Sequence, residues 1–555
     1  GIIKRHQILL RAGSNRLAYL EPDQMTQPSN ESRPNSGRKA PPQSARALVE
    51  EGHRLASTGK KQAAFARYQT AVTQRAGFAP AMLGMAEIHL QSGQTSAART
   101  ILRTIDQWTD DGPALGKAAG LLLQLRCEEE AERAATRALA TKGSNRVTIQ
   151  RIRGEARRIL RRLKEALVDF EKSASGGDEF AMVRRSTVLR ELNQLDEAQK
   201  HCPDPHALRV PAAKAAAWHE RATLADQIGD ATTAFEGWTK AGALEGELPE
   251  WRRLDRTLWP RQVQVWTEWC RTTAQNPTPP RSGSEETTLS PPHFLVGFSR
   301  TGTTLLERML SGHSAIATSG EAPLVTTVRQ HLLQGQPIER LPHLVPDNTS
   351  SKAEQLRDLF DRTAESLVPD AAKAPCFIHK QPMNIIDLPM ILQLWPRSLI
   401  IRTIRDPRDV VLSCFSQHFA ANGINRHFLD IESTANMVAK VQALNQAVDA
   451  CFPDANIIDV RYEEFVEDPE STLRVILERL GLDFEPEVLD PTRDTSIQQT
   501  PSFLEAKKMV HSNRTERWRQ YEPQLRRPCH ILDEWIQKSG WPPWELDEHL
   551  DANPA

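Results

Sequence analysis

The chain has 555 residues, more than one hydrophobic core accommodates, so two or more domains are expected. Its 70 Lys and Arg and 71 Asp and Glu leave a net charge of −1, which excludes a protein that binds nucleic acid through an overall basic field. The hydrophobic fraction of 39%, without any apolar run of about 18 residues, argues against a membrane span and is typical of a globular protein.

The 7 cysteines are scattered and form neither CxxC pairs nor Cys/His clusters. This usage predicts reduced thiols in a reducing compartment, hence a cytoplasmic protein, and no metal site. Residues 1–44 are polar, rich in Pro, Ser, Asn and Arg, and lack the apolar core of a signal peptide, so we expect a disordered segment there. Met25 is a candidate for the true first residue.

Residues 45–248 repeat themselves with a period of about 34 residues, in about six units. The twentieth position of every unit is alanine, the eighth is small, and a large residue usually follows four positions after the alanine. The units begin near residues 45, 79, 112, 147, 179 and 215. The alanines are Ala64, Ala98, Ala131, Ala166, Ala198 and Ala234.

This pattern has a physical reason. Two antiparallel helices approach closely only where their facing side chains are small, and a large residue then fills the groove toward the next pair. The pattern resembles tetratricopeptide repeats (TPR), which stack into an all-α superhelix. The resemblance implies a concave surface for a protein or peptide; the alternative is a scaffold that only packs on its neighbour domain. Residues 249–290 are interpreted as a helix capping the superhelix, followed by a linker.

One stretch of the repeats departs from the balanced charge of the chain. Arg151–Lys164 is a basic run. Two interpretations stay open, a solvated helix face and a patch for an acidic substrate.

Between residues 291 and 545, short apolar runs alternate with helical stretches. This alternation predicts an α/β domain in which buried parallel strands are joined by right-handed helical crossovers. Residues 546–555 are interpreted as a tail. The predicted strands are Phe294–Phe298, Cys376–His379, Leu399–Ile404 and Ile457–Val460.

The segment Ser299-Arg-Thr-Gly-Thr-Thr304 lies between the first predicted strand and a helix. Backbone N–H groups and the helix dipole converge on an anion at such a place. Gly302 lets the backbone approach closely, and Arg300 adds a fork of N–H donors. Thr303 and Thr304 add hydroxyl donors. The Gly-Lys-Ser/Thr ending of a Walker A loop is missing, so ATP or GTP fits poorly.

A second segment, Ile404-Arg-Asp-Pro-Arg-Asp409, also follows a predicted strand. We expect Asp406 to cap the next helix and Pro407 to occupy its first position. Arg405 then lies at the carboxyl edge of the sheet, where α/β sheets bind ligands, and Ser413 lies about two turns into the helix. An arginine and a hydroxyl so placed can hold a second phosphate.

The two segments together resemble the phosphate sites of sulfotransferases that use 3′-phosphoadenosine-5′-phosphosulfate (PAPS). With TPRs upstream, the chain is similar to bacterial TPR-containing sulfotransferases and to tyrosylprotein sulfotransferases, over about residues 293–545. The resemblance implies transfer of a sulfuryl group from PAPS to a hydroxyl acceptor, with release of adenosine 3′,5′-bisphosphate and without a metal. Ser299 and Thr301 depart from the family's usual proline and serine, and Gln417 stands where some relatives carry another arginine.

Individual roles follow from the same resemblance. It implies that Glu321 is the catalytic base and that Lys380 contacts the bridging oxygen, while Ser502 lies in a late loop over PAPS. From the residues alone, the alternatives are a helix cap for Glu321, a solvated strand end for Lys380 and turn chemistry for Ser502. The implied nucleotide-binding residues are Arg300, Thr301, Gly302, Thr303 and Thr304 at the 5′ end, Arg405 and Ser413 at the 3′-phosphate, and Tyr462, Lys508 and Arg517 nearby.

Three functions are weighed. The first is an active sulfotransferase whose acceptor is a protein tyrosine, a carbohydrate or a small molecule. The second is a P-loop kinase, which the missing Walker lysine opposes. The third is a TPR scaffold with an inactive PAPS-binding domain, which the presence of Glu321 and Lys380 opposes. A protein or peptide acceptor bound by the TPR array is the expected partner, and a homo-oligomer is compatible with the sequence.

Overall fold

The computed structural model describes residues 44–275, 291–490 and 515–545. The chain divides into two compact units, residues 1–213 and residues 214–555. Nearly all of the predicted disordered segment, the predicted linker from residue 276 and the predicted tail lie outside the described residues. The proposed limits of these segments stay predictions.

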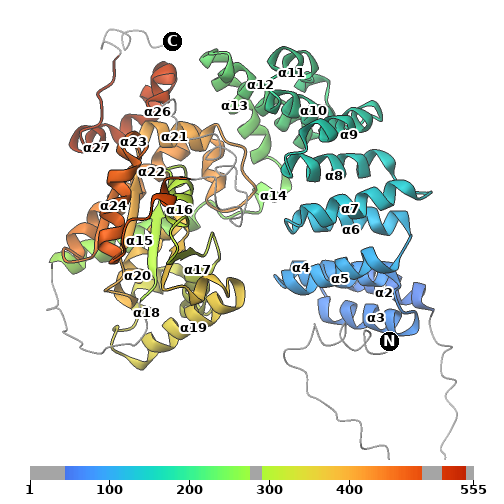
Figure 1. Cartoon of the computed structure of the whole chain (residues 1–555), viewed down its shortest axis with the longest axis horizontal. Coiled ribbons are helices and arrows are strands. Elements are labelled where there is room, and N and C mark those ends of the chain that lie inside the picture. Colours follow the sequence, from blue (N-terminus) through green and yellow to red (C-terminus); the bar gives the residue numbers. More distant parts are fainter. Residues whose placement is uncertain (1–43, 276–290, 491–514, 546–555) are drawn as a thin grey trace, which may run out of the picture. The chain divides into compact units, whose positions relative to one another are not determined.

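Helical hairpins form the first unit, drawn from blue to teal in Figure 1. In this unit, the first helix of every hairpin begins within one residue of the predicted start of a repeat. The paired helices are α2 (Ala45–Ser57) and α3 (Lys61–Gln74), α4 (Ala79–Gln91) and α5 (Thr95–Trp108), α6 (Gly112–Gln124) and α7 (Glu128–Ala140), α8 (Arg146–Ile159) and α9 (Leu163–Ser175), and α10 (Glu179–Glu191) and α11 (Leu195–His201).

The small positions of the repeats lie in the core, as predicted. All six alanines at the twentieth position are 0% exposed. Tyr68 shows why small residues are needed opposite a large one: a Cβ on Gly52 would lie 2.4 Å from its ring, and a Cβ on Gly84 of the next pair would lie 2.5 Å from it. The two glycines therefore form the groove that the tyrosine fills, within its own pair and toward the next one.

The basic run of the repeats is neutralised by carboxylates. Asp169, which is fully buried, accepts from Arg153 Nε and Arg157 Nη1, both at 2.9 Å. The carboxylates that pair with the run come from α7, α8, α9 and the start and end of α10, so the pairs join successive hairpins. Further pairs are Arg151 with Asp178, Arg157 and Arg162 with Glu132, Arg158 with Glu155 and Glu191, and Arg161 with Glu191. The run therefore stabilises the stack and is not a bare patch for an acidic substrate.

Asp169→Asn tests this network. The variant keeps the shape of the side chain and leaves two partly buried guanidinium groups without their shared counter-charge, so we expect a loss of about 3 kcal/mol in the free energy of unfolding of the array. Urea unfolding followed by circular dichroism measures it. Glu171→Gln on the exposed side of the same helix is the control, with an expected change within about 0.5 kcal/mol. Equal stability of the two variants would contradict the structural role of the network.

The second unit contains a five-stranded sheet in the order β2-β3-β1-β4-β5, and every neighbouring pair is parallel. The four predicted strands are confirmed. Sequence analysis missed the short edge strand β2, whose three residues give too little alternation to recognise. The strands are β1 (His293–Gly297), β2 (Ile316–Thr318), β3 (Cys376–Lys380), β4 (Ile400–Ile404) and β5 (Ile457–Arg461).

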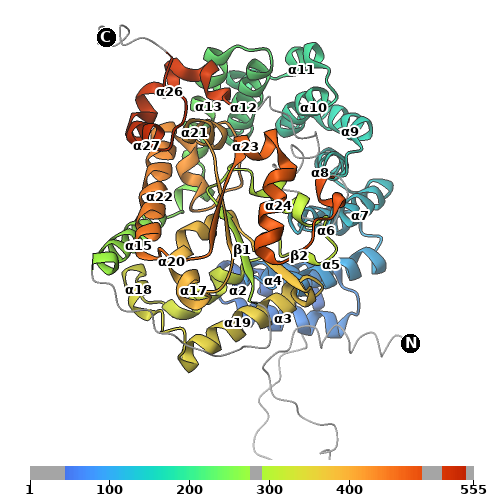
Figure 2. The same cartoon turned by 60° about the vertical axis from the view of Figure 1, so that its left-hand side comes forward.

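Helices cover both faces of this sheet, with α20 and α22 on one side of the strands and α24 on the other (Figure 2). Side chains of β1 alternate between the two layers: Phe294 and Val296 pack with α22, and Leu295 packs with α16 and α24. The helices are α16 (Thr303–Leu310), α17 (Leu324–Leu333), α18 (Leu341–Leu344), α19 (Ser351–Leu367), α20 (Leu388–Leu394), α21 (Pro407–Phe415), α22 (Ile431–Cys451), α23 (Tyr462–Glu467), α24 (Pro469–Leu480), α26 (Glu522–Cys529) and α27 (Asp533–Lys538).

Four helices that precede the sheet also belong to the second unit, apart from the first residues of α12. The helices are α12 (Pro211–Gln227), α13 (Ala231–Gly246), α14 (Pro249–Arg252) and α15 (Leu258–Gln275). The helix predicted to cap the superhelix, α15, packs mainly along α22. Its buried Val263 and Trp266 join the core under the sheet, and Trp269 lies 6.2 Å from the Phe452 ring. The tryptophan-rich stretch therefore supports the α/β layer, and its role as a cap of the repeats stays a prediction.

Within the described ranges, no helix combines the length and the apolar character needed to cross a bilayer. The same ranges contain no group of three or more His, Cys, Asp or Glu side chains arranged to hold a metal ion.

Candidate active site

The carboxyl ends of the parallel strands bring together residues from distant parts of the sequence. The loop that begins with Phe298 follows β1, Lys380 is the last residue of β3, Arg405 follows β4 and Tyr462 follows β5. Because parallel strands end at one edge of the sheet, these side chains share one region. The sequence predicted a position at the carboxyl edge of the sheet for Arg405. The order of the strands shows that the other residues lie at the same edge.

The loop between β1 and α16 is a tight turn in which two residues have positive φ, Arg300 at 71° and Gly302 at 100°. A Cβ on Gly302 would lie 2.5 Å from Tyr462 Cδ2, so only glycine fits there. The N–H and the hydroxyl of Thr301 both donate to the Phe298 carbonyl, at 3.3 and 2.7 Å. Thr301 thus closes the turn, and a contact from it to a ligand stays a prediction. Thr303 begins α16, as expected.

The two predicted phosphate segments are in direct contact. Arg300 Nε donates to Ser413 Oγ at 3.0 Å, and Arg405 Nη1 donates to the Arg300 carbonyl at 3.1 Å. The Arg405 guanidinium lies 4.6 Å from the centre of the Tyr462 ring. Residues expected at opposite ends of one ligand therefore form a single cluster, in which Arg300 links the first loop to α21.

The start of α21 follows the prediction. Asp406 is the N-cap and accepts from the Arg408 N–H at 2.9 Å, and Pro407 is the first helical residue. Arg408 is fully buried, bonds the Asp406 carboxylate at 2.6 Å and lies 3.5 Å from the centre of the Trp518 ring. These contacts fix the helix that carries Ser413.

Lys380 lies between two carboxylates. Its Nζ is 2.7 Å from Glu321 Oε1 and 3.2 Å from Glu307 Oε2. The Lys380 side chain is 2% exposed, which excludes a solvated strand end. Glu321 is 38% exposed and caps no helix, since the N-cap of α17 is Pro323. The buried ammonium group therefore holds an accessible carboxylate at the edge of the sheet.

Glu307 is the site residue that sequence reasoning missed. It lies one turn into α16 and is fully buried. The signal was available: an acidic residue stands on the otherwise apolar face formed by Leu306, Met309 and Leu310. The partner of Glu307 could not be predicted, because Lys380 lies on β3, far from α16 in the sequence.

Burial and charge shift the pKa values around Lys380. Burial raises the pKa of Glu307, and the Lys380 charge only partly opposes this. Burial lowers the pKa of Lys380, but the attraction of Glu307 and Glu321 exceeds that effect, so its pKa is raised and the amine stays charged. Burial and the Lys380 charge lower the pKa of His379 to about 3, so His379 is neutral. It bonds Ser319 at 2.6 Å.

The remaining predicted residues are Ser502, Lys508 and Arg517. Ser502 and Lys508 lie outside the described residues. Arg517 is described, and its Nη2 is 2.7 Å from Asp226 Oδ1 on α12. The assignment of roles to all of these residues stays a prediction.

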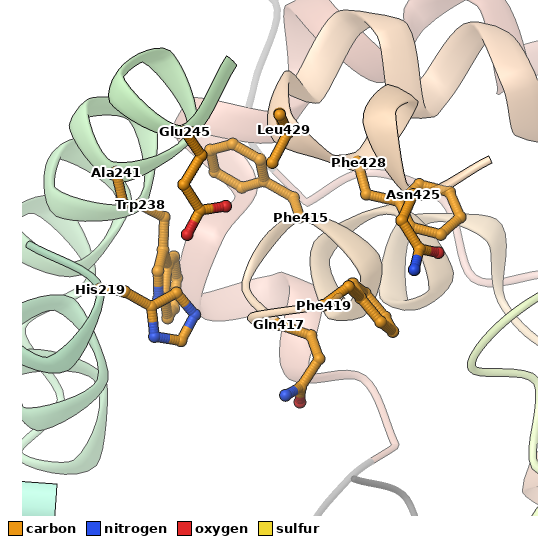
Figure 3. Close-up of a pocket in the computed structure, with 11 residues that line it drawn as sticks. His219, Trp238, Ala241, Glu245, Phe415, Gln417, Phe419, Asn425, Phe428 and Leu429 are labelled. Atoms are coloured by element: carbon orange, nitrogen blue, oxygen red, sulfur yellow. The ribbon is translucent and has the colours of Figure 1, made fainter. Parts of the chain in front are cut away.

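A small pocket lies beside the cluster, where α12 and α13 face the end of α21 (Figure 3). Trp238 and Glu245 line one side of the pocket, and Phe415 and Phe428 line the other. Gln417 lies at the rim of the pocket. Its volume of about 10 Å³ holds about one water molecule. The pocket is therefore too small for a substrate, and Gln417 is one of the residues that line it.

The α/β domain has known relatives. Residues 291–486 match the model of the sulfotransferase family, and residues 55–122 match the tetratricopeptide repeat model. The chain contains a sulfotransferase domain. The first unit carries the tetratricopeptide repeats, as the spacing of the alanines predicted.

Individual relatives match this sulfotransferase-containing chain in part. An uncharacterized protein of Aquifex aeolicus is 28% identical over 47% of the chain and 34% of its own length. Protein-tyrosine sulfotransferase A of Caenorhabditis elegans is 25% identical over 36% of the chain and 52% of its own. Omega-hydroxy-beta-dihydromenaquinone-9 sulfotransferase Stf3 of Mycobacterium bovis is 24% identical over 37% of the chain and 66% of its own length. The chain thus spans about a third to a half of the length of the first two relatives.

Lys380→Met tests the electrostatics of the carboxylate–lysine cluster without any substrate. The variant leaves the Glu307 carboxylate buried without its counter-charge, which we expect to lower the free energy of unfolding by about 3 kcal/mol at neutral pH. The uncompensated burial raises the pKa of Glu307 further above its unfolded value. The deficit therefore shrinks as pH falls toward the unfolded value and grows as pH rises toward the folded one.

Urea unfolding of the variant across the acid range measures this dependence. Glu307→Gln in the Lys380→Met background is the matched control and should remove most of the pH-dependent deficit. A deficit that is the same at every pH, or one that persists in the double variant, would contradict the assigned pairing.

Proposed function

We propose that the domain transfers a sulfuryl group from PAPS to the hydroxyl of an acceptor and releases adenosine 3′,5′-bisphosphate. The proposal rests on one observation: Arg300, Arg405, Lys380 and Glu321 gather at the carboxyl edge of one parallel sheet. The family match supports the reaction class. Use of PAPS and the roles of single residues are parts of the proposal.

The chain's own groups offer hydrogen-bond donors and positive charge to the phosphates of such a ligand. The turn before α16 offers the N-terminus of a helix, where an anion is favoured. Arg300 and Arg405 add guanidinium groups beside it, and Ser413 adds a hydroxyl. Tyr462 lies against both Gly302 and Arg405 and restricts the space between them. The ligand competes with the internal partners of these side chains when it binds.

Transfer needs a base and a charge that stabilises the leaving group. Glu321 takes the proton of the acceptor hydroxyl, whose oxygen forms a bond to sulfur. The bond from sulfur to the bridging oxygen breaks, and the electrons stay on the departing 5′-phosphate. Lys380 and Arg300 stabilise the charge that grows there. Glu307 compensates part of the Lys380 charge, since its Oε2 lies 3.2 Å from the ammonium that also contacts Glu321 at 2.7 Å.

We propose a tyrosine hydroxyl of a polypeptide as the acceptor. Two features support this: relatives named protein-tyrosine sulfotransferase, and tetratricopeptide repeats that offer a surface to a peptide. The menaquinone-derived acceptor named for another relative is the competing case. Incubation with radiolabelled PAPS and cell extract shows which class of molecule takes the label, and label confined to lipid would contradict the peptide acceptor.

Nucleotide selectivity tests the reaction class. We expect adenosine 3′,5′-bisphosphate to bind more tightly than ATP in isothermal titration, because the loop lacks the Walker lysine. Arg405→Ala should weaken its binding by roughly 1.5–3 kcal/mol through loss of a charge-assisted bond. Arg474→Ala, at an exposed position of α24, is the control and should leave the affinity unchanged. Tighter binding of ATP would favour a kinase and overturn the proposal.

Glu321→Gln separates binding from chemistry. The variant keeps the shape of the side chain and removes the base, so we expect transfer from radiolabelled PAPS to fall at least a hundredfold. Binding of adenosine 3′,5′-bisphosphate should change less than about twofold. Glu354→Gln on the exposed side of α19 is the control. Full transfer by Glu321→Gln would refute the role of Glu321, and loss of binding would refute its assignment to chemistry alone.

A further inference from the structure

The helices that precede the sheet are bonded directly to a residue predicted to contact the nucleotide. Arg517 begins the short helix η8 (Arg517–Tyr521), and its Nη2 donates to Asp226 Oδ1 at 2.7 Å. The Tyr521 hydroxyl donates to the same oxygen at 2.5 Å. Asp226 lies on α12, inside the second compact unit with η8. One carboxylate therefore holds both ends of η8.

Two aromatic rings make cation–π contacts with the guanidinium group of Arg517. The Arg517 guanidinium carbon lies 5.7 Å from the centre of the Trp238 ring and 5.6 Å from that of Tyr521. Trp238 on α13 is 2% exposed and packs against Tyr521 with 5.7 Å between ring centres. A charged edge contact and a stacked face together leave the guanidinium few orientations. The helical pair α12–α13 thus sets where Arg517 points.

On its other side, η8 reaches the second phosphate segment. The Trp518 N–H donates to Asp409 Oδ1 at 2.9 Å. Asp409 is buried on α21, and its Oδ2 lies 3.6 Å from Arg405 Nη2. Asp409 also acts on Arg517: burial lowers the pKa of that guanidinium, but the attraction of Asp226, Tyr521 and Asp409 together exceeds this effect and raises it. A continuous set of contacts therefore runs from α12 through η8 to Arg405.

We propose that Asp226 is a positioning residue for the nucleotide site, acting through Arg517. The inference rests on the proposed function and extends it: the helical pair α12–α13 supports the site that recognises the phosphates of PAPS. Asp226 fixes η8, Arg517 is aimed by that contact, and Asp409 joins η8 to Arg405.

The test uses full-length variants and titration with adenosine 3′,5′-bisphosphate. Asp226→Asn keeps the shape and removes the charge, and we expect roughly tenfold weaker binding. Arg517→Ala should give a similar loss, and the double variant should bind no more weakly than Arg517→Ala alone. Asp230→Asn at the exposed N-cap of α13 is the control; asparagine also caps helices, so its affinity should match that of the wild type.

Two further measurements separate positioning from simple destabilisation. Thermal unfolding reports whether Asp226→Asn stays folded, and Asp226→Glu, which restores the carboxylate, should recover part of the lost affinity. Tyr521→Phe removes the second bond to Asp226 without changing charge, and it serves if Asp226→Asn does not fold: we expect weaker binding in this variant as well.

The outcomes separate this inference from the proposed function. Wild-type protein that fails to bind adenosine 3′,5′-bisphosphate overturns both. Wild-type protein that binds, together with a folded Asp226→Asn variant of unchanged affinity, overturns only the role of Asp226. Additive losses in the double variant also overturn it, because they show that Asp226 acts independently of Arg517. If Asp226→Asn does not fold, wild-type affinity in Tyr521→Phe also overturns the role of Asp226.

Discussion

The common carboxyl edge of the five parallel strands is the constraint on which the site depends. With β1 at the centre of the order β2-β3-β1-β4-β5, the loop after β1 has β3 on one side and β4 on the other. Lys380 and Arg405 therefore flank the same turn although they are far apart in the sequence. No local feature brings them together, because only hydrogen bonding between strands sets which segments are neighbours.

Charge compensation is the second requirement of this arrangement. Moving a cation from water into the interior is costly unless an anion accompanies it. Lys380 has Glu307 and Glu321, and Arg402 on β4 has Asp449 and Asp459 at 2.8 and 2.5 Å. Partners differ in exposure: Glu307 is fully buried, and Glu321 is accessible. This difference suits one carboxylate to a fixed electrostatic role and the other to contact with a substrate.

The helical repeats follow a different physical rule, in which contacts are local and the pattern recurs. A fully buried alanine in each unit and the glycines around Tyr68 permit close approach of helices, and paired charges such as Asp169 with Arg153 and Arg157 join successive hairpins. The last pair, α12 and α13, keeps the repeat spacing but packs within the second unit. The sequence repeat and the compact units thus divide the chain at different places.

The sequence alone determined the repeats, four strands, the turn before α16 and the Asp406–Pro407 start of α21, because each depends on spacing or on residues within one turn of each other. It also named Lys380 and Glu321 as candidate site residues, through resemblance to a known family. Tertiary structure decided what lies beside them. The burial of Lys380, its contact with Glu307, the bond from Arg300 to Ser413 and the hold of Asp226 on Arg517 all join segments that the sequence separates. Such contacts depend on strand order and helix packing, which residue spacing does not encode.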